Sequence, residues 1–504
     1  MAAMEQAEGR LLCHLLADLA VDVPAIQVQD ITASSDKVVP GALFLACRGG
    51  QHHGLEFVAE AVAAGATVVV WEPEEGLESP QLPDAVTGIP VEHLGAQVGS
   101  IADRFFAEPS TELQLTGVTG TNGKTTVAWL TSQALSRLGG AVAYMGTLGY
   151  GMVPELLPSA LTTPGCILVH RRLRELLDQG ASGAVLEVSS HGLDQGRVDG
   201  VQLDVAAFTN LSRDHLDYHG DLDAYKAAKA RLFSVSSLEA AVINVGDSFG
   251  AQLAGELDGD IRVITVALAG RSYMKDGQQA DLRADFEESA QAGLRLKFSG
   301  EFGAAELVSP MWGDFNAENL LVATGLILAH GYTLEQAITA LQSVRPPPGR
   351  MQLVEGSESA PTVIVDFAHT PDALLQALQT VRAHSSGRVV CVFGCGGNRD
   401  EGKRTEMGAI AAQLADHVIV TNDNPRDEDP QQIVAAIVEG FTSDSSHEVI
   451  ADRATAIRTA IEQSTADDVV LIAGKGSENF QLTGTSAEAF SDAAVAAEIL
   501  GAAS

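Results

Sequence analysis

The segment that most restricts the fold of this chain is LQLTGVTGTNGKTTVAWLTSQAL, residues 113–135 of 504. An apolar strand, Leu113–Val118, leads into a glycine turn, and an amphipathic helix begins near Lys124. A phosphate-binding loop requires this order of strand, loop and helix. Gly120 and Gly123 allow successive N–H groups to point at phosphate oxygens, and the positive end of the helix adds to them. The segment therefore predicts an α/β domain that binds a nucleotide.

Two side chains of this loop suit ATP. Lys124 can reach the β and γ phosphates, and the Thr125 hydroxyl can bind the magnesium ion that accompanies ATP, with Thr126 as the alternative. The strict pattern G-x-x-x-x-G-K-[ST] is not met, because Val118 stands where the first glycine belongs. A plain glycine turn with a surface lysine is the other reading of the segment, but the flanking strand and helix favour ATP.

The composition is typical of a soluble globular protein: 46% of the residues are hydrophobic, and no run approaches the roughly 20 apolar residues of a membrane-spanning helix. The N-terminus lacks the features of a secretory signal, so we expect a cytoplasmic location. A formal net charge of -35 argues against binding to nucleic acid or to an anionic membrane. The five cysteines are scattered, and we expect them to be reduced.

Length alone suggests about three domains. Residues 1–110 contain short apolar runs between glycine-rich loops, which fits a small N-terminal α/β module. Residues 111–344 alternate strands with helices and predict a larger central α/β domain with a mostly parallel sheet. Strands are expected there at Gly183–Val188, Val205–Asn210 and Ala241–Val245.

A proline run, Arg345–Arg350, cannot continue the preceding helix and marks the start of a third domain, residues 345–504. Four apolar strands alternate there with amphipathic helices, which predicts a doubly wound, Rossmann-like sheet. These strands are Thr362–Phe367, Arg388–Gly394, His417–Thr421 and Asp468–Gly474. Ligands of such sheets bind beyond the carboxyl ends of the strands, so we expect the site residues to follow them.

The loop TGTNGKTT, residues 119–126, resembles that of the Mur ligases and of their folylpolyglutamate synthetase relatives. The resemblance covers about residues 30–480 and looks closest to the MurE branch, which adds the third residue of the peptidoglycan precursor peptide. It implies that residues 1–110 bind the uridine nucleotide, residues 111–344 bind ATP and residues 345–504 bind the incoming amino acid. The ATP loop that it implies consists of Gly120, Thr121, Asn122, Gly123, Lys124, Thr125 and Thr126.

The activity that the resemblance implies is an ATP-dependent, ADP-forming ligation. It adds meso-diaminopimelate to the D-glutamate of UDP-MurNAc-L-Ala-D-Glu through an acyl phosphate, in the cytoplasmic stage of peptidoglycan synthesis. The three substrates are small molecules, and we expect a monomer.

The resemblance also implies two magnesium ions. One accompanies ATP, and the second is held partly by a carbamate on a lysine. The metal ligands that it implies are Thr125, Glu187, His215 and Lys229, the last as the carbamate. Judged from the residues alone, Asp214 and His219 compete with His215 as ligands. Lys226, one turn earlier on the expected helix, competes with Lys229.

Further contacts follow from the same resemblance. For the adenine and ribose of ATP they are Asn316, Asn319, Arg350 and Asp366. For the sugar-peptide they are Thr162, Thr163, Ser189, Gln195 and Arg197. Two asparagines three residues apart share one face of a helix, although the first could instead cap it. The Thr-Thr-Pro and Ser-Ser segments also fit an ordinary turn and an ordinary strand end.

The N-terminal module departs from the family pattern. The usual D-S-R triplet reads Ser34–Asp36 here, and the later D-G-H reads His53–Leu55. We therefore expect only Ser35 and Gln51 to contact the uridine nucleotide.

The tetrapeptide Asp423–Arg426, DNPR, resembles that of the diaminopimelate-adding ligases. A guanidinium there can hold the second carboxylate of meso-diaminopimelate, which lysine lacks, and Glu478 suits the distal ammonium. The amino-acid pocket that the resemblance implies consists of Arg399, Asp423, Asn424, Pro425, Arg426, Gly474 and Glu478. Ser477 replaces the histidine of the family's G-K-G-H-E, and Phe480 replaces an aromatic hydroxyl. Taken alone, Asn-Pro also fits a turn.

Two other functions compete with this interpretation. One is a related ligase, either a lysine-adding enzyme or a folylpolyglutamate synthetase; the DNPR segment and the N-terminal module argue against it. The other is a nucleotide-binding regulator without activity. The intact set of Lys124, Glu187, His215 and Lys229 argues against that.

Overall fold

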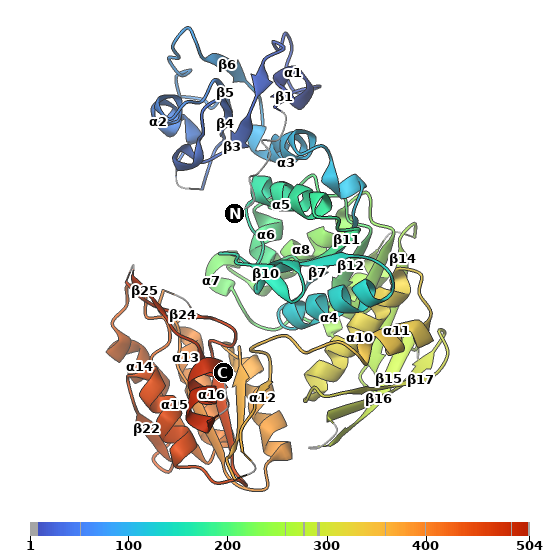
Figure 1. Ribbon diagram of the computed structural model, residues 1–504, viewed down its shortest axis with the longest axis vertical. Helices are drawn as coiled ribbons and strands as arrows, with labels where there is room; N and C mark the ends of the chain where they lie inside the picture. The colour runs from blue at the N-terminus through green and yellow to red at the C-terminus, as the bar shows by residue number, and fades with distance from the viewer. Residues whose placement is uncertain are drawn as a thin grey trace. The chain divides into compact units, whose positions relative to one another are not determined.

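The computed structural model describes residues 9–50, 52–257, 259–275, 278–289, 293–357, 359–398, 400–484 and 486–501. As far as they are described, these residues form two compact units. The first unit comprises Met1–Thr116, Gly140–Asp204 and Val235–Ser237, and the second comprises Gly117–Gly139, Val205–Ser234 and Leu238–Ser504. Figure 1 labels many of the helices and strands that are named below.

The N-terminal module of the first unit is a small parallel sheet with helices on both faces. Its strands are adjacent in the order β3 (Asp30–Thr32), β4 (Ala42–Ala46), β5 (Val68–Trp71) and β6 (Thr87–Pro90). Alternate residues of β4 and β5 face α1 (Leu12–Leu15) and α3 (Leu94–Phe105) on one side and α2 (Val58–Ala63) on the other. The predicted α/β module is confirmed.

Short elements complete this module. The strands β1 (Arg10–Leu11) and β2 (Gln27–Val28) form an antiparallel pair. Three 3-10 turns are η1 (Ser35–Lys37), η2 (Gly54–Phe57) and η3 (Pro109–Thr111). The η2 turn leads into α2, and a capping box holds its start. The His53 side chain accepts a hydrogen bond from Leu55 N, and Glu56 accepts one from His53 N.

The rest of the first unit carries a parallel strand pair extended by an antiparallel hairpin. The pair is β8 (Val142–Gly146) with β11 (Gly183–Glu187), and the hairpin adds β9 (Gly149–Met152) and β10 (Glu155–Leu157). The helices are α5 (Cys166–Asp178) and α6 (Ser190–Asp194). Strand β7 (Gln114–Thr119) begins in this unit and ends in the second one.

The second unit begins with α4 (Lys124–Arg137), which directly follows the glycine loop. Four strands run parallel, namely β12 (Val205–Phe208), β13 (Ala240–Asn244), β14 (Arg262–Leu268) and β15 (Leu282–Ser289). The helices of this part are α7 (Leu216–His219), α8 (Leu222–Ala230), α9 (Ser248–Glu256), α10 (Asp314–Ala329) and α11 (Leu334–Leu341), with a 3-10 turn η4 (Arg231–Ser234). The predicted strands near residues 205 and 241 are confirmed.

An antiparallel extension of this sheet was not predicted. It consists of β16 (Gly293–Gly300) and β17 (Ala305–Ser309), which continue from β15. The segment Gly293–Ser299, GLRLKFS, alternates apolar and polar residues, and its apolar side chains are buried. This alternation is the expected pattern for a strand with one solvated face.

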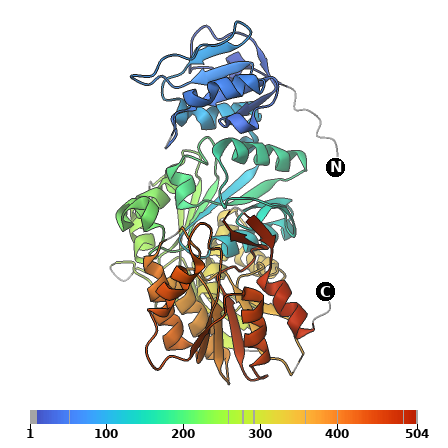
Figure 2. The same cartoon turned by 90° about the vertical axis from the view of Figure 1, so that its left-hand side faces the viewer.

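The C-terminal part of the second unit is a six-stranded sheet in the order β18 (Gln352–Val354), β19 (Thr362–Asp366), β23 (Val469–Ala473), β20 (Val389–Phe393), β21 (His417–Val420) and β22 (His447–Val449). Only β18 is antiparallel to its neighbour. One face packs against α12 (Pro371–His384), α13 (Gly402–Leu414) and α14 (Pro430–Val438), and the other against α15 (Arg453–Glu462) and α16 (Asp492–Leu500). The doubly wound sheet is confirmed, and Figure 2 shows its helices in orange and red. A hairpin, β24 (Phe480–Thr483) with β25 (Ser486–Ala489), follows β23.

A buried ion pair joins the last two helices of this domain. Arg453 donates from Nε and Nη2 to the two carboxylate oxygens of Asp492, at 2.7 Å each, and both side chains are 0% exposed. Nη2 also donates to the carbonyl oxygen of Ala473 at 2.9 Å. The pair therefore fixes α15 and α16 to the end of the central strand β23.

We expect Arg453→Met to lower the free energy of unfolding by about 3–5 kcal/mol, because it leaves the Asp492 carboxylate buried without its partner. Urea unfolding followed by circular dichroism measures this. Arg458→Met, on the same helix, is the control. Arg458 pairs with Glu462 at 3.8 Å while both side chains are more than half exposed, so this change should cost about 0.5 kcal/mol or less. Equal losses in the two variants would contradict the prediction.

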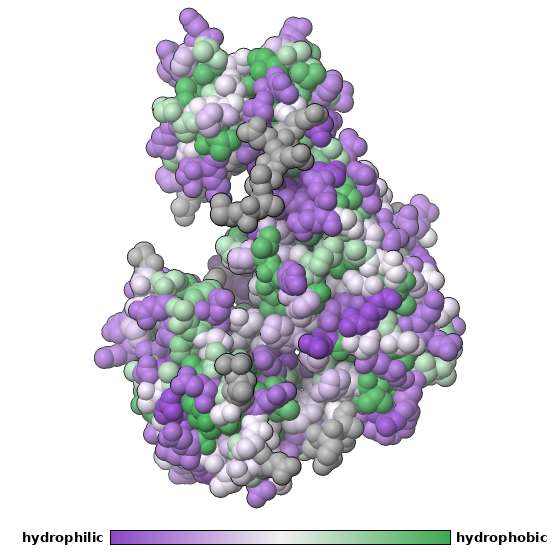
Figure 3. Space-filling view, viewed as in Figure 1, coloured by the Kyte–Doolittle hydropathy of each residue, from purple (hydrophilic) through white to green (hydrophobic). Residues whose placement is uncertain are grey.

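The surface shown in Figure 3 is a mosaic in which hydrophilic residues are interspersed with smaller hydrophobic areas. In the part of the chain that the structure describes, we found no helix with the length and apolar character needed to cross a bilayer.

Candidate active site

The glycine loop after β7 has the backbone geometry of a phosphate-binding loop. Lys124, the first residue of α4, donates from Nζ to the carbonyl oxygens of Gly120 and Thr121 at 2.9 Å each. Asn122 N donates to Asn210 Oδ1 at 2.9 Å, and Thr209 Oγ1 donates to the Asn122 carbonyl oxygen at 2.6 Å. The segment after β12 therefore holds the loop in place.

Both glycines of the loop are required by their surroundings. Gly120 and Gly123 have φ values of +148° and +84°, a region that other residues rarely adopt. A Cβ atom at Gly120 would overlap the Thr209 hydroxyl, and one at Gly123 would overlap the Asn319 side-chain oxygen. The second overlap shows that Asn319 lies directly against the loop.

Lys229 is buried next to the same loop. Its side chain is 1% exposed, and Nζ donates to the carbonyl oxygen of Gly120 at 2.7 Å and lies 4.3 Å from the centre of the Tyr225 ring. Burial lowers the pKa of Lys229 well below its ordinary value, the charge of Lys124 lowers it further, and Asp214 opposes the shift. Burial therefore favours the neutral form of this amine, which is unusual for a lysine.

Asp214 and His215 follow β12 and face the same region. His215 has a positive φ of +54° and directly precedes α7, and its Nε2 lies 3.2 Å from Asp214 Oδ2. Burial alone would raise the pKa of Asp214, but the charges of His215, His369, Lys403 and Lys124 together lower it. This carboxylate is therefore ionised at neutral pH.

The predicted ATP contacts Asn316 and Asn319 lie on one face of α10, as the three-residue spacing indicated. Asn319 Nδ2 donates to Asn316 Oδ1 at 3.1 Å, and Asn316 Nδ2 donates to the Trp312 carbonyl oxygen at 2.7 Å. Gly313, not Asn316, is the residue that precedes the helix, so the alternative of a cap at Asn316 is wrong.

Arg350 and Asp366 are also brought to this region. Arg350 Nη2 donates to Thr125 Oγ1 at 3.0 Å, and its guanidinium lies 4.2 Å from the centre of the Phe367 ring. Asp366 ends β19 and accepts from Met351 N and Ala368 N at 2.7 and 2.8 Å. Burial raises the pKa of Asp366, although these hydrogen bonds and Arg350 oppose the shift.

Glu318, on α10 beside the two asparagines, carries a shifted pKa. Burial raises its pKa from 4.5 to about 7, against the opposing charge of Arg271, whose Nη1 lies 3.6 Å away. The folded protein therefore binds a proton that the unfolded chain releases between these pH values, so the free energy of unfolding falls as the pH rises from about 4.5 to 7.

We expect Glu318→Gln to remove this decrease of the free energy of unfolding with rising pH. The free energy of unfolding of the variant minus that of the unmodified protein should be greater at pH 8 than at pH 5, by on the order of 1–3 kcal/mol. Urea unfolding at the two pH values measures the difference. Glu335→Gln, at an exposed residue of α11, is the control and should show no such pH dependence. An identical pH profile for the Glu318 variant and the unmodified protein would refute the assignment.

The first unit groups Glu187 with several predicted contacts for the sugar-peptide. Glu187 ends β11 at 2% exposure and accepts hydrogen bonds from the Tyr144 hydroxyl and, at 2.9 Å, from Thr147 N. The Thr163 hydroxyl donates to the Glu187 carbonyl oxygen at 2.9 Å and accepts from Ser189 N at the same distance. Glu187 and Thr163 are therefore held in one rigid network.

The remaining members of this group lie around Thr163. Arg197 donates to the Gln195 side-chain oxygen at 2.6 and 3.0 Å and to the Thr163 carbonyl oxygen at 2.8 Å. Thr162 and Thr147 share a hydrogen bond of 3.0 Å between their hydroxyls. Ser189 is the cap of α6, because its Oγ accepts from Gly192 N. The structure thus brings all five predicted sugar-peptide residues together.

The N-terminal module places Ser35 at the start of η1, where its hydroxyl donates to Glu60 Oε2 at 3.1 Å. Ser34 donates to Asp36, so the first and last residues of the altered triplet are hydrogen-bonded to each other. Gln51 and Arg399, which were predicted to contact the uridine nucleotide and the amino acid, lie outside the described residues. The uridine contacts stay a prediction.

The predicted amino-acid pocket lies at the carboxyl ends of β21 and β23. Asn424 Nδ2 donates to Glu478 Oε2 at 2.9 Å, and a Cβ at Gly474, where φ is +116°, would approach Asp423 Oδ2 to 2.9 Å. Arg426, which follows Pro425, has φ of +53° and donates from Nη1 to the Gly397 carbonyl oxygen at 2.8 Å. The structure brings all the described members of this pocket together.

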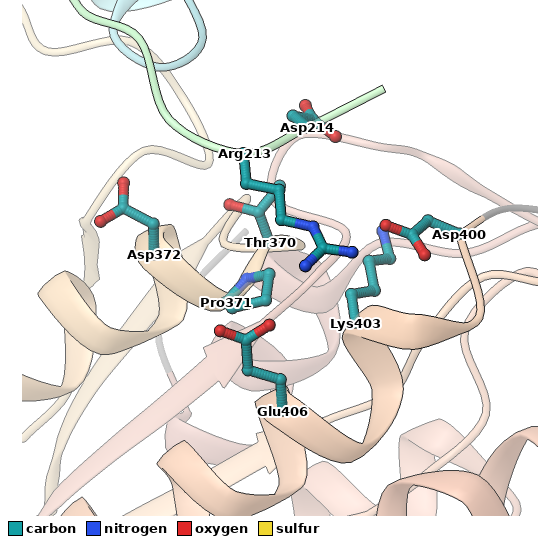
Figure 4. A pocket seen from close by; sticks show the side chains of 8 residues that line it. All are labelled: Arg213, Asp214, Thr370, Pro371, Asp372, Asp400, Lys403 and Glu406. Atoms are coloured by element: carbon teal, nitrogen blue, oxygen red, sulfur yellow. The ribbon is translucent and has the colours of Figure 1, made fainter. Parts of the chain in front are cut away.

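A further pocket in the second unit contains residues that sequence reasoning missed. Figure 4 shows Arg213 extending toward the helix that carries Lys403 and Glu406, with Asp372 at the start of α12. Its lining residues are Arg213, Asp214, Thr370, Pro371, Asp372, Asp400, Lys403 and Glu406. Asp372 Oδ2 accepts from the loop residue Asn122 at 3.1 Å. The rule that ligands bind beyond strand ends could have found Arg213 and Asp372.

Charges of both signs line this pocket. Lys403 Nζ donates to the His369 carbonyl oxygen at 2.9 Å, and burial, helped by the charge of Lys403, lowers the pKa of His369 to about 4. His369 is therefore neutral at physiological pH. Such a pocket suits a ligand that carries an ammonium and an acidic group at once.

The residues present fit a magnesium ion bound together with ATP. Among the described residues no group of three or more His, Cys, Asp and Glu side chains lies close enough to hold a metal by itself. Magnesium commonly takes only one or two protein ligands and completes its shell with phosphates and water. Thr125, at the start of α4, offers a hydroxyl oxygen of this kind. Glu187 belongs to the first unit, and its relation to Thr125, His215 and Lys229 stays a prediction.

Comparison with known proteins gives matches along most of the chain. Residues 27–106 match the model "Mur ligase family, catalytic domain", residues 118–327 match "Mur ligase middle domain" and residues 349–476 match "Mur ligase, glutamate ligase domain". A Xanthomonas campestris protein named UDP-N-acetylmuramoyl-L-alanyl-D-glutamate--2,6-diaminopimelate ligase is 45% identical, with 97% of each chain covered. A Xylella fastidiosa protein of the same name is 44% identical with the same coverage.

A solved structure supports the same relationship. It bears the name UDP-N-acetylmuramoyl-L-alanyl-D-glutamate--2,6-diaminopimelate ligase and is 34% identical, with a TM-score of 0.68. The match covers 98% of this chain and 99% of the other. Together with the phosphate-binding loop and the three matched domains, these likenesses show that the chain belongs to the Mur ligase family.

Proposed function

We propose that this chain is the ATP-dependent ligase that joins meso-diaminopimelate to the D-glutamate carboxylate of UDP-MurNAc-L-Ala-D-Glu, in peptidoglycan precursor synthesis. One observation carries the proposal. The loop Thr119–Thr126 has the glycine conformations, the helix start and the lysine of an ATP site, in a chain 45% identical to a ligase of that name over 97% of its length.

Two chemical steps account for the reaction. An oxygen of the D-glutamate carboxylate attacks the γ-phosphorus of ATP, ADP leaves, and an acyl phosphate results. The amine of meso-diaminopimelate then attacks the acyl carbon, phosphate leaves with the bonding electrons, and the nitrogen loses a proton. Activation is needed because a free carboxylate at neutral pH has no adequate leaving group.

The protein's contribution is mainly electrostatic and positional. Lys124, held over the loop by Gly120 and Thr121, is placed to neutralise the phosphoryl group during transfer. Asn319 lies against the loop, and Arg350 donates to the Thr125 hydroxyl, which supports the proposal that both contact the nucleotide. Magnesium supplies further charge neutralisation at the phosphates when it is bound. Thr125, Glu187, His215 and Lys229 would hold two such ions.

A carbamate on Lys229 is part of the proposal. Carbon dioxide reacts with a neutral amine, and burial holds the pKa of Lys229 well below its ordinary value. The reaction forms an N–C bond, releases one proton and turns the amine into an anionic oxygen ligand. The buried position beside Gly120 also protects the product from water.

The carbamate has a direct spectroscopic test. We expect protein equilibrated with ¹³C-bicarbonate to give a carbamate carbon signal in ¹³C NMR that is absent from Lys229→Met. Lys226→Met is the matched control, because Lys226 lies on the same helix with its side chain 30% exposed and pairs only with Asp223 among the contacts described. A spectrum of the unmodified protein without this signal would reject the carbamate and leave the ligase assignment intact.

The whole proposal is tested by phosphate release from ATP in the presence of UDP-MurNAc-L-Ala-D-Glu. We expect release that depends on meso-diaminopimelate, with a peptide-bonded product confirmed by mass spectrometry. Release with L-lysine alone would favour a lysine-adding ligase. Binding of ATP without any release, with each amino acid in turn, would favour a nucleotide-binding regulator.

A further inference from the structure

Lys475 is a buried cation beneath the proposed amino-acid pocket. It follows Gly474 at the end of β23, and its side chain is 0% exposed. Nζ donates to Asn424 Oδ1 at 2.9 Å and lies 3.3 Å from Glu478 Oε2. A buried ammonium is costly unless it is paired and hydrogen-bonded, so these two partners account for its position.

The three side chains form a closed triangle. Besides its contact with Lys475, Glu478 Oε2 accepts a hydrogen bond from Asn424 Nδ2 at 2.9 Å. Asn424 Oδ1 accepts a second hydrogen bond, from Leu482 N in the hairpin β24–β25, also at 2.9 Å. Every polar atom of the Asn424 amide therefore has a fixed partner, and the amide has one orientation. Lys475 is the member of the triangle that lies farthest from solvent, since Glu478 is 29% exposed.

The charges of this triangle determine what the pocket can accept. Glu478, a predicted member of the pocket, has a carboxylate whose charge is balanced by the buried ammonium of Lys475, 3.3 Å away. Asp423 and Arg426 add one formal charge of each sign, so the pocket residues Asp423, Arg426 and Glu478 together with Lys475 have no net formal charge. A ligand end that carries both an ammonium and a carboxylate, and so has no net charge, matches such a balanced site. A lone ammonium, such as the end of an L-lysine side chain, would gain from an unbalanced carboxylate instead.

We propose that Lys475 is a positioning residue that fixes Asn424 and Glu478 and thereby sets the preference of this site for a zwitterionic amino-acid side chain over a cationic one. The inference rests on the proposed function, since it assumes that these residues face the incoming amino acid. It adds to that function a residue that acts on the amino-acid pocket only through Asn424 and Glu478.

The test is a comparison of substrates in the Lys475→Met variant, in which a side chain of similar length loses its charge. We expect the KM for meso-diaminopimelate to rise about tenfold, as for loss of a hydrogen bond to a charged group. The ratio of kcat/KM for meso-diaminopimelate to that for L-lysine should fall by at least as much. The KM values for ATP and for the sugar-peptide should stay within about twofold, because a loss confined to one pocket does not alter the other two.

A double variant separates positioning from simple stability. If Lys475 acts through Glu478, the effects of the two substitutions should not add, because the residues are coupled. The ratio of kcat/KM for meso-diaminopimelate to that for L-lysine should then be no lower in Lys475→Met/Glu478→Gln than in Glu478→Gln alone. Arg388→Met is the structural control. Arg388 precedes β20 at the opposite end of that strand from the pocket, bonds to Asp468 and Gln463, and should leave the selectivity unchanged.

Each outcome has a defined meaning. Unchanged selectivity in Lys475→Met, or a parallel loss for all three substrates, overturns the inference. If Lys475→Met does not fold but the double variant does, the result supports the inference that Lys475 balances the charge of Glu478. If neither of these variants folds while Glu478→Gln does, Lys475 is only structural and the inference is wrong. Failure of the proposed function is distinct, because it shows as unmodified protein that releases no phosphate with meso-diaminopimelate.

Discussion

Phosphate release by Lys124→Met is expected to be lower than that of the unmodified protein by on the order of 10³-fold, with the loss mainly in kcat. Methionine preserves the length of the side chain but cannot donate to the phosphates. Lys124 Nζ lies 2.9 Å from two carbonyl oxygens of the loop, so its charge is held at the loop that we propose binds the phosphates. Steady-state kinetics with saturating sugar-peptide and meso-diaminopimelate measure the effect.

The control for this prediction is Lys226→Met, which removes an equal charge from a partly exposed position of the same unit. It should retain a rate within about twofold of the unmodified protein, as surface ion pairs contribute little. Thermal unfolding of both variants checks that they are folded. A Lys124 variant that keeps more than a tenth of the activity would exclude the proposed role of this lysine in phosphoryl transfer.

The second large effect is expected from Arg426→Ala. The kcat/KM for meso-diaminopimelate should fall about 100-fold, equivalent to about 3 kcal/mol, because we propose that this guanidinium binds the second carboxylate bidentately. The kcat/KM for L-lysine should change little, since lysine has no second carboxylate. Arg426→Lys should be intermediate, because an ammonium keeps the charge but not the planar pair of donors.

The competing substrates give this experiment its control. Both are measured with the same enzyme preparation, so any loss of folded protein lowers the two rates together. Equal decreases of kcat/KM for meso-diaminopimelate and L-lysine would mean that Arg426 stabilises the loop and does not bind the second carboxylate. Its Nη1 contact with Gly397 and its left-handed backbone conformation make that alternative a real one to test.

Much of the fold followed from local patterns in the sequence. The apolar runs that begin near residues 183, 205, 241, 362, 388, 417 and 468 are strands whose ends lie within two residues of the predicted limits. These strands are buried on both faces, so their sequences are continuous apolar runs that stand out from the flanking loops. The weaker alternation of β15–β17 and of the hairpin β9–β10 was not recognised, because one polar side chain in two dilutes the signal.

The site residues also fall into those that the sequence predicted and those that it did not. Residues fixed by local motifs, such as Lys124 in its loop or Arg426 in DNPR, could be named from the sequence. Lys475 could not, although it stands between two glycines, because nothing in the sequence says that its side chain turns inward to Asn424 and Glu478. Arg213 and Lys403 are 190 residues apart by number, and only the folded chain places both in one pocket. Long-range proximity is the part that sequence patterns do not encode.

The buried pair of Arg453 and Asp492 makes the last helix a support of substrate recognition. Arg453 donates from Nε and Nη2 to Asp492 in the first turn of α16, and Nη2 also donates to the carbonyl oxygen of Ala473, one residue before Gly474. A protein shortened just before Asp492 would therefore lose more than a peripheral helix. Its sheet would retain most of its apolar contacts, but the strand end from which Lys475 and Glu478 project would no longer be anchored from below. Deletions at this end should impair selection of the amino acid sooner than they impair binding of ATP.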